Sequence, residues 1–164
     1  MSEPLDHLQK MFTMYKALGE KAMAQVPDER LFWTFANDSN SIAILVQHLS
    51  GNMLSRFTRF FEEDGEKPWR QRDREFEHVL VSRSEINAEW EKGWNCFFEL
   101  LNSLSVSDLQ RTITIRGEAM TAHVALDRQL AHYAYHVGQM VFLAKMLAPS
   151  EWKSLSIPKR SAVK

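Results

Sequence analysis

The chain has 164 residues, a length that suits a single domain with a real hydrophobic core. Hydrophobic residues make up 45% of it, which argues against intrinsic disorder, and 20 basic and 21 acidic residues leave a net charge of −1, which argues against a nucleic-acid-binding surface. With only 6 glycines and 5 prolines, the composition favours long helices over a fold with many turns.

Two helices are expected in the first third of the chain. The first begins at Pro4, which a first helical turn tolerates, and ends at Pro27. A polar cluster at residues 37–41 then offers N-cap side chains to a second helix, which we expect to end near residues 63–65. In both segments the apolar residues recur at steps of three and four, as on the core-facing side of a helix.

A charged connector follows at residues 65–77, where basic and acidic side chains cancel and a loop or irregular crossing is expected. Its segment Trp69-Arg70-Gln71-Arg72 has two interpretations. These residues could clamp an anionic substrate over the end of the helices. The interpretation that we favour is a loop anchored by a buried Trp69.

The third helix is expected to open at Ser82, because Ser82 and Glu85 have capping-box spacing and an apolar stripe follows them. Residues 112–118 then alternate at period two around Gly117, which is typical of a short hairpin but too short to found a sheet.

The fourth helix is expected from about Thr121 to Ala148, and it is apolar on more than one side. A helix of this kind is buried widely, so we predict a further packing partner, a second copy in a homodimer. The chain is thus expected to form one domain at residues 1–148 with a loosely held tail at residues 149–164.

No membrane span or secretory leader is expected. The longest stretch free of Asp, Glu, Lys and Arg lies between Arg128 and Lys145, and it falls short of the ~20 apolar residues that a span needs. The N-terminus lacks the basic and apolar regions of a signal peptide. The single cysteine, Cys96, excludes an intramolecular disulfide, so a cytoplasmic location is expected.

Two histidines of the fourth helix form the main candidate site. His132 and His136 are one turn apart, so they share a helix face with Cβ atoms roughly 5–6 Å apart. Both imidazoles can then reach one metal ion. Such a pair is a weak signal when it stands alone, although Gln129 and Gln139 share the same face and offer hydrogen bonds.

A third histidine, His48, lies in the apolar stretch IAILVQHL of the second helix. A lone histidine there is more often a core residue than a ligand, but three histidines in the middles of two helices together favour a metal site in the core. Asn52, one turn beyond His48, joins Gln129 and Gln139 as a candidate for supporting the ligands or contacting a substrate. Ordinary polar packing explains these three residues equally well.

The stretch from His132 to Met140, HYAYHVGQM, resembles the H-x-x-x-H-x-G-Q signature of the DinB/YfiT-like superfamily. Residues 40–49, NSIAILVQHL, are similar to the second-helix motif that supplies the first ligand of that superfamily, and residues 56–70 are similar to one of its uncharacterised branches. The resemblance extends to about Leu147. It implies an all-α fold, a four-helix bundle with an up-down-down-up course that is often dimeric.

The resemblance also implies a divalent ion, usually zinc or nickel, held by the residues that match, His48, His132 and His136. Some members of the superfamily are thiol-dependent transferases or isomerases that use low-molecular-weight thiols, and many carry only a hydrolase label. For this chain we therefore expect a metal-dependent S-transferase or a hydrolase acting on a small molecule. Two alternatives stay open: a non-catalytic or stress-related bundle with a structural ion, and a helical interaction module without metal.

Three histidine ligands leave at least one position open on a tetrahedral ion, which is typical of a catalytic site. Neutral imidazoles leave the ion's +2 charge uncompensated, so the open position favours thiolate or hydroxide. Zinc, nickel, copper and iron(II) all suit such ligands. No general base stands out, so the catalytic residues and the substrate stay undetermined from the sequence.

Overall fold

Four long α-helices dominate the computed structural model, which describes residues 3–148 and 152–157. They are α1 (Glu3–Met23), α2 (Ile42–Phe57), α3 (Arg83–Ser103) and α4 (Ala122–Leu147). The connections carry three short 3-10 helices, η1 (Asp28–Phe32), η2 (Arg72–Phe76) and η3 (Val106–Gln110). The prediction of a mainly helical fold is confirmed.

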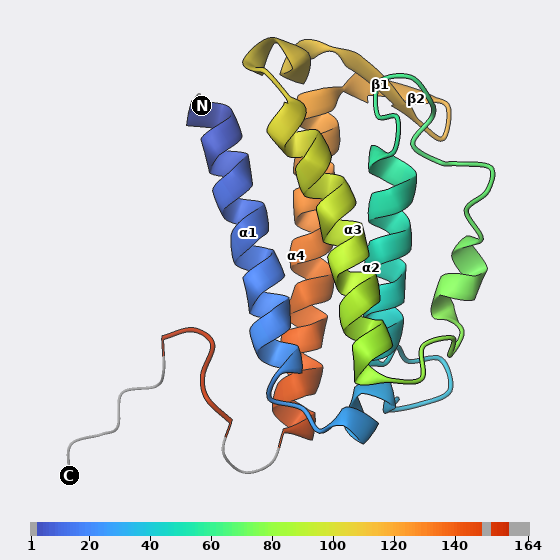
Figure 1. The fold of residues 1–164 in the computed structure, drawn as a ribbon, viewed down its shortest axis with the longest axis vertical. Helices are drawn as coiled ribbons and strands as arrows, with labels where there is room; N and C mark the ends of the chain where they lie inside the picture. Colours follow the sequence, from blue (N-terminus) through green and yellow to red (C-terminus); the bar gives the residue numbers. More distant parts are fainter. Residues whose placement is uncertain (1–2, 149–151, 158–164) are drawn as a thin grey trace.

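The four helices lie side by side (Figure 1), with α2 packed on α3 and on α4, and with α1 packed on α4 and on α3. In Figure 1, α1 and α4 run downward while α2 and α3 run upward. The shared direction of α2 and α3 depends on the long connector between them, which returns along the outside of α2 and contains η2.

The core between the helices is strongly aromatic. Phe12 of α1, Trp94 and Phe97 of α3, and Tyr133 of α4 are all fully buried. The ring of Phe12 lies 4.2 Å from that of Phe97 and 6.0 Å from that of Tyr133, measured between centroids. Rings of this size bury large apolar areas, so they fix the spacing of α1, α3 and α4.

Side-chain caps begin three of the helices, two of them at the places that the sequence predicts. Ser41 accepts a hydrogen bond from the backbone N–H of Ile44 at the start of α2, and Thr121 begins α4 in the same way. Ser82 and Glu85 form the reciprocal capping box that opens α3.

The predicted hairpin is also present, as β1 (Thr112–Ile115) paired antiparallel with β2 (Glu118–Thr121). Thr112 lies opposite Thr121 in the register of this pair, so β2 leads directly into α4.

The end of α2 differs from the prediction. The helix ends at Phe57, well before residues 63–65, because Thr58 adopts an extended conformation and Arg59 a left-handed one with φ 49°. Phe60 is nevertheless buried, since the turn after α2 folds it back onto the core. The apolar pattern therefore predicts correctly that Phe60 is buried, but it does not predict where the helix ends.

The predicted tail at residues 149–164 is described only at 152–157. There Trp152 and Leu155 pack against the core, and the backbone N–H of Lys153 donates to Oε1 of Gln25 at 2.7 Å. Residues 149–151 and 158–164 lie outside the described part. Among the helices described, none combines the length and apolar character that crossing a membrane requires.

Candidate metal centre

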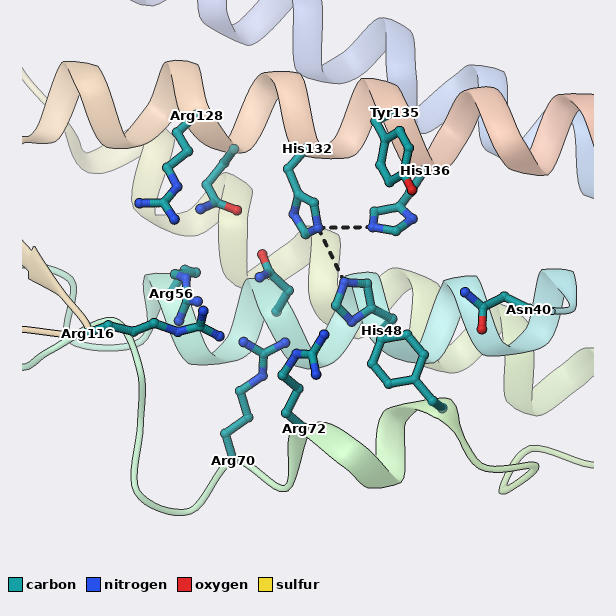
Figure 2. Close-up of a pocket in the computed structure, with 13 residues that line it drawn as sticks. Asn40, His48, Arg56, Arg70, Arg72, Arg116, Arg128, His132, Tyr135 and His136 are labelled. Carbon is teal, nitrogen blue, oxygen red and sulfur yellow. Dashed lines mark hydrogen bonds between the residues drawn. The ribbon is translucent and has the colours of Figure 1, made fainter. Parts of the chain in front are cut away.

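The structure brings the three predicted histidines together. His48 projects from the middle of α2, and His132 and His136 project toward it from α4 (Figure 2). Nε2 of His132 lies 3.0 Å from Nε2 of His136 and 3.3 Å from Nε2 of His48. One ligand atom from each residue lies within 4.8 Å of the others, so the three side chains could hold one metal ion.

These separations fit the chemistry of the ligand set. Nitrogens bound to one tetrahedral ion at ~2.0–2.1 Å are about 3.3–3.4 Å apart. The observed Nε2–Nε2 distances of 3.0 and 3.3 Å are close to that value. Only small movements would separate the present geometry from a coordinated one.

Hydrogen bonds on the far side of two of the rings point Nε2 toward the cluster. Nδ1 of His48 lies 2.9 Å from Oε2 of Glu75, and a carboxylate can only accept, so Nδ1 of His48 carries the proton and donates. Nδ1 of His136 lies 3.0 Å from the side-chain oxygen of Gln139 and donates likewise. In the neutral form of each ring this leaves Nε2 unprotonated, and Nε2 is the atom that faces the cluster and that a metal ion would bind.

Burial keeps the histidines of α4 neutral. Burial, reinforced by repulsion from His136 and His48, lowers the pKa of His132 to about 3. Burial and the neighbouring His48 lower the pKa of His136 to about 4. Near pH 7 both rings are therefore in the neutral form that metal binding requires.

Glu75, which the sequence did not single out, completes the support of His48. It belongs to η2 and accepts two hydrogen bonds from Arg70, at 2.7 Å from Nε and 2.8 Å from Nη2. Burial would raise the pKa of Glu75, but His48 and Arg70 outweigh it, and the pKa is lowered. The only signal in the sequence was the charged connector itself. Glu75 and His48 lie in different elements, so no helical spacing relates one to the other.

The other polar residues singled out from the sequence line or support the site. Gln139 contacts His136 as described. Asn52 is buried, lines the cavity beside the histidines and accepts a 3.1 Å hydrogen bond from the hydroxyl of Tyr133. Gln129 is also buried and lines the cavity, and its Oε1 has no hydrogen-bond partner within the described part of the chain.

This cavity has a volume of about 460 Å³ and borders all three histidines. Five arginines line it as well: Arg56, Arg70, Arg72, Arg116 and Arg128. The expectation that a buried Trp69 anchors the connector is wrong, because Trp69 is 54% exposed. The connector is joined to α2 instead through Glu75, which pairs with Arg70 inside the connector and contacts His48 of α2. The side chain of Arg70 is 2% exposed.

The remaining histidines, His7, His78 and His123, are exposed. His123 lies 3.6 Å from Asp127, away from the cluster. Cys96 is half-buried against the core beside Thr58, and burial raises the pKa of its thiol.

A family model described as a protein of unknown function, DUF1572, matches residues 2–161, which is nearly the whole chain. No curated protein and no solved structure matches it. The family description leaves the chemistry open, so the geometry of the site carries the functional conclusion.

Proposed function

We propose that this chain, which belongs to the DUF1572 family, binds one divalent metal ion through His48, His132 and His136 and uses it in a reaction on a small molecule. One observation carries the proposal: three imidazole nitrogens converge at the wall of a cavity large enough for a small-molecule substrate.

A DinB-like four-helix bundle with an up-down-down-up course is part of the proposal. The opposed directions of α1 and α4 against α2 and α3 in Figure 1 support it. So does the role of Gln139, the glutamine of the H-x-x-x-H-x-G-Q stretch, which bonds one of the histidines.

Zinc or nickel is the ion that we propose, because neutral imidazoles suit both. When bound, such an ion would lower the pKa of a water or thiol at its open position and so supply a nucleophile near neutral pH. Glu75 and Gln139 would hold two of the rings in place. Gln129 would offer its unpaired oxygen to a substrate donor.

These features suit a transferase of the thiol-dependent S-transferase type or a hydrolase. A non-catalytic ion, which only fastens α2 to α4, is the alternative. In its favour, the His48–Glu75–Arg70 chain of hydrogen bonds ties α2 to the connector, which is a structural arrangement. The cavity beside the histidines favours catalysis, because a purely structural site is closed.

Metal analysis of the purified protein tests the site. We expect one divalent ion per chain in the wild type and in the control variant His123→Ala, because His123 is exposed and distant from the cluster. His136→Ala should lose most of the metal. If His136→Ala retained as much metal as the wild type, the proposed site would be wrong.

Activity assays then separate catalysis from structure. The metal-loaded protein should conjugate a thiol to an electrophile or hydrolyse an ester or amide, and chelation should abolish the reaction. A metal-loaded protein that failed in every such assay, while chelation lowered its melting temperature, would support the structural ion instead.

We also propose that two copies of the chain pair through the outward face of α4. Tyr135, Phe142 and Met146 of that face are 60%, 66% and 51% exposed, and the exposed Gly138 lies between them. A row of large apolar side chains beside a glycine can pack closely against its own copy in a two-fold dimer.

A further inference from the structure

The lining of the cavity indicates what kind of molecule it takes. We infer that the substrate carries an anionic group, a carboxylate or a phosphate, several bonds away from the atom that reaches the metal. This inference extends the proposed function, and it rests on that proposal only for the part of the substrate that reaches the metal.

The cavity is strongly one-sided in charge. Arg56 comes from α2, Arg70 and Arg72 from the connector and η2, Arg116 from the hairpin turn and Arg128 from α4, and their side chains approach the cavity from these separate elements (Figure 2). Among the cavity-lining residues in the described part of the chain, none has a carboxylate. Guanidinium groups gathered in this way are the usual receptors for carboxylates and phosphates.

Three of these arginines share two carboxylates, which do not neutralise their positive charge. Glu66 is shared by Arg56 at 2.9 Å, Arg116 at 2.9 Å and Arg70 at 3.7 Å. Glu75 pairs with Arg70 but also serves His48. Partly buried like charges repel one another strongly, so an anion bound in the cavity would relieve a repulsion that the fold itself creates.

Arg72 and Arg128 have the most hydrogen-bonding capacity to offer. Their side chains are 50% and 51% exposed, and their nearest ion-pair partners within the described residues are 3.6 and 3.9 Å away. Those distances are too long for good hydrogen bonds. Their N–H groups can therefore turn to a bound anion without breaking a good hydrogen bond to a carboxylate.

Three of the arginines, Arg56, Arg116 and Arg128, lie to one side of the metal end. Arg128 precedes His132 by one turn of α4, about 6 Å along the axis, and Arg56 follows His48 by about two turns of α2, about 12 Å. Because α2 and α4 run in opposite directions, both displacements point toward the hairpin and its Arg116 (Figures 1 and 2). An anion held there is separated from the three histidines, so the molecule must be long enough to span both ends.

The test uses Arg72→Gln and Arg128→Gln, because both side chains are half-exposed and their ion pairs are long. Arg128→Gln is the cleaner of the two, since the guanidinium of Arg72 also lies 5.0 Å from the centroid of the Phe76 ring. Arg56 and Arg70 are unsuitable, since both anchor the connector from buried positions. Arg111→Gln is the control: its guanidinium is 54% exposed and lies over Phe61, so the variant removes one positive charge outside the cavity.

Two titrations read out the two ends of the cavity. Mercaptohexanoate and its neutral amide are titrated into the cobalt(II)-loaded protein, where absorption from thiolate bound to cobalt reports binding. Inorganic phosphate and glutarate are titrated by calorimetry into the metal-free protein. The second pair distinguishes a preference for phosphate from one for carboxylate, and it needs no metal.

We expect mercaptohexanoate to bind about tenfold more tightly than its amide, and each cavity variant to remove most of this difference. Phosphate or glutarate binding should weaken by about tenfold in the same variants, and Arg111→Gln should match the wild type in every titration. Equal affinity for the acid and the amide, or an equal loss in Arg111→Gln, would overturn the inference.

Failure of the proposed function would look different. A wild type that took up no metal would remove the metal site, while phosphate binding that depended on Arg72 and Arg128 would leave the anion site standing. Conversely, a protein that bound cobalt and thiols but had equal affinity for the acid and the amide would support the metal site and contradict this inference.

Discussion

Glu75 and Gln139 orient the rings of two different histidines in the same way. Each accepts the Nδ1 proton of its ring, at 2.9 Å from His48 and 3.0 Å from His136, and so points Nε2 at the cluster. They differ in charge and in attachment. Glu75 is a carboxylate clamped by Arg70, and a carboxylate behind an imidazole both orients the ring and makes it a stronger ligand.

Glu75→Gln should therefore weaken metal binding by roughly 10–100-fold, because the ring of His48 loses its charged acceptor while the side-chain shape is kept. Competition with a chelator of known affinity measures the change. Glu77→Gln is the matched control, an exposed glutamate two positions along the same segment. Equal affinities in the two variants would show that Glu75 does not support the ligand.

The candidate site could be predicted from the sequence only where regular spacing marks it. His132 and His136 are one helical turn apart, and the periodicity of α4 puts them on one face. His48 needed the family resemblance, because a single histidine has no spacing of its own. Glu75 and Arg116 come from a connector and a turn, where no period relates a residue to its spatial neighbours.

At the level of elements, α2 and α3 approach each other closely at Gly93. A Cβ atom added there would lie 2.7 Å from the Cα atom of Ser50, and backbone cannot move aside as a flexible side chain can. Gly93→Ala should thus force the helices apart and lower the free energy of unfolding by about 1–3 kcal/mol.

Urea denaturation measures this loss. Asn95→Ala is the control, because Asn95 is an exposed residue of the same helix, where alanine should be neutral or stabilise by up to about 0.7 kcal/mol. A Gly93→Ala protein as stable as Asn95→Ala would mean that the two helices tolerate a wider separation.

Asp64 fastens the hairpin turn to the connector. Its carboxylate accepts backbone hydrogen bonds from Arg116 at 2.9 Å, Gly117 at 2.8 Å and Glu66 at 2.6 Å. Arg116 and Gly117 can present their N–H groups together because both have positive φ, 56° and 77°. Arg116 reaches the cavity from this turn, so Asp64 also positions one end of the proposed anion site.

The same contacts make a pH prediction. Burial would raise the pKa of Asp64, but the three backbone hydrogen bonds outweigh it and lower the pKa below its ordinary value of 3.8. A carboxyl whose pKa is lower in the folded chain stabilises the fold above about pH 4 and loses this effect as pH falls through the folded pKa.

Asp64→Asn should therefore be less stable than the wild type at pH 7, and the two should converge below about pH 4. Thermal unfolding across this range measures the difference. Asp38→Asn changes an exposed aspartate and should follow the wild type at every pH. A difference for Asp64→Asn that did not depend on pH would point to lost shape instead of lost charge.

Helix starts were easier to predict than helix ends. Ser41, Ser82 and Thr121 are cap residues whose side chains bond the backbone locally, so a few letters of sequence determine them. The end of α2 coincides with a positive φ at Arg59, a conformation that its residue type does not favour and that the local sequence therefore does not predict.

At the scale of the whole molecule, the connector between α2 and α3 shapes the site. By returning the chain along α2, it lets α2 and α3 run in the same direction (Figure 1). It also lays η2 beside His48, whose ring lies 4.9 Å from that of Phe76. The number of helices follows from apolar periodicity. Their directions do not, because a connector of mixed charge gives no indication of whether it turns back sharply or runs the length of its neighbour.

The outward face of α4 allows the proposed dimer to be tested. Its exposed apolar side chains include Phe142, which is 66% exposed, and no Asp, Glu, Lys or Arg occurs between Arg128 and Lys145. A glutamate in place of Phe142 would put two like charges close to the two-fold axis of a paired dimer, where they would be desolvated and would repel each other.

We therefore expect Phe142→Glu to be a monomer at micromolar concentration, while the wild type has twice the chain mass by light scattering. Met14→Glu is the matched control, since Met14 is an apolar helix residue, 47% exposed, on α1 instead of α4. The circular dichroism of both variants should match that of the wild type, which separates lost pairing from lost folding. A monomeric wild type, or dissociation by Met14→Glu as well, would rule out the α4 face as the dimer interface.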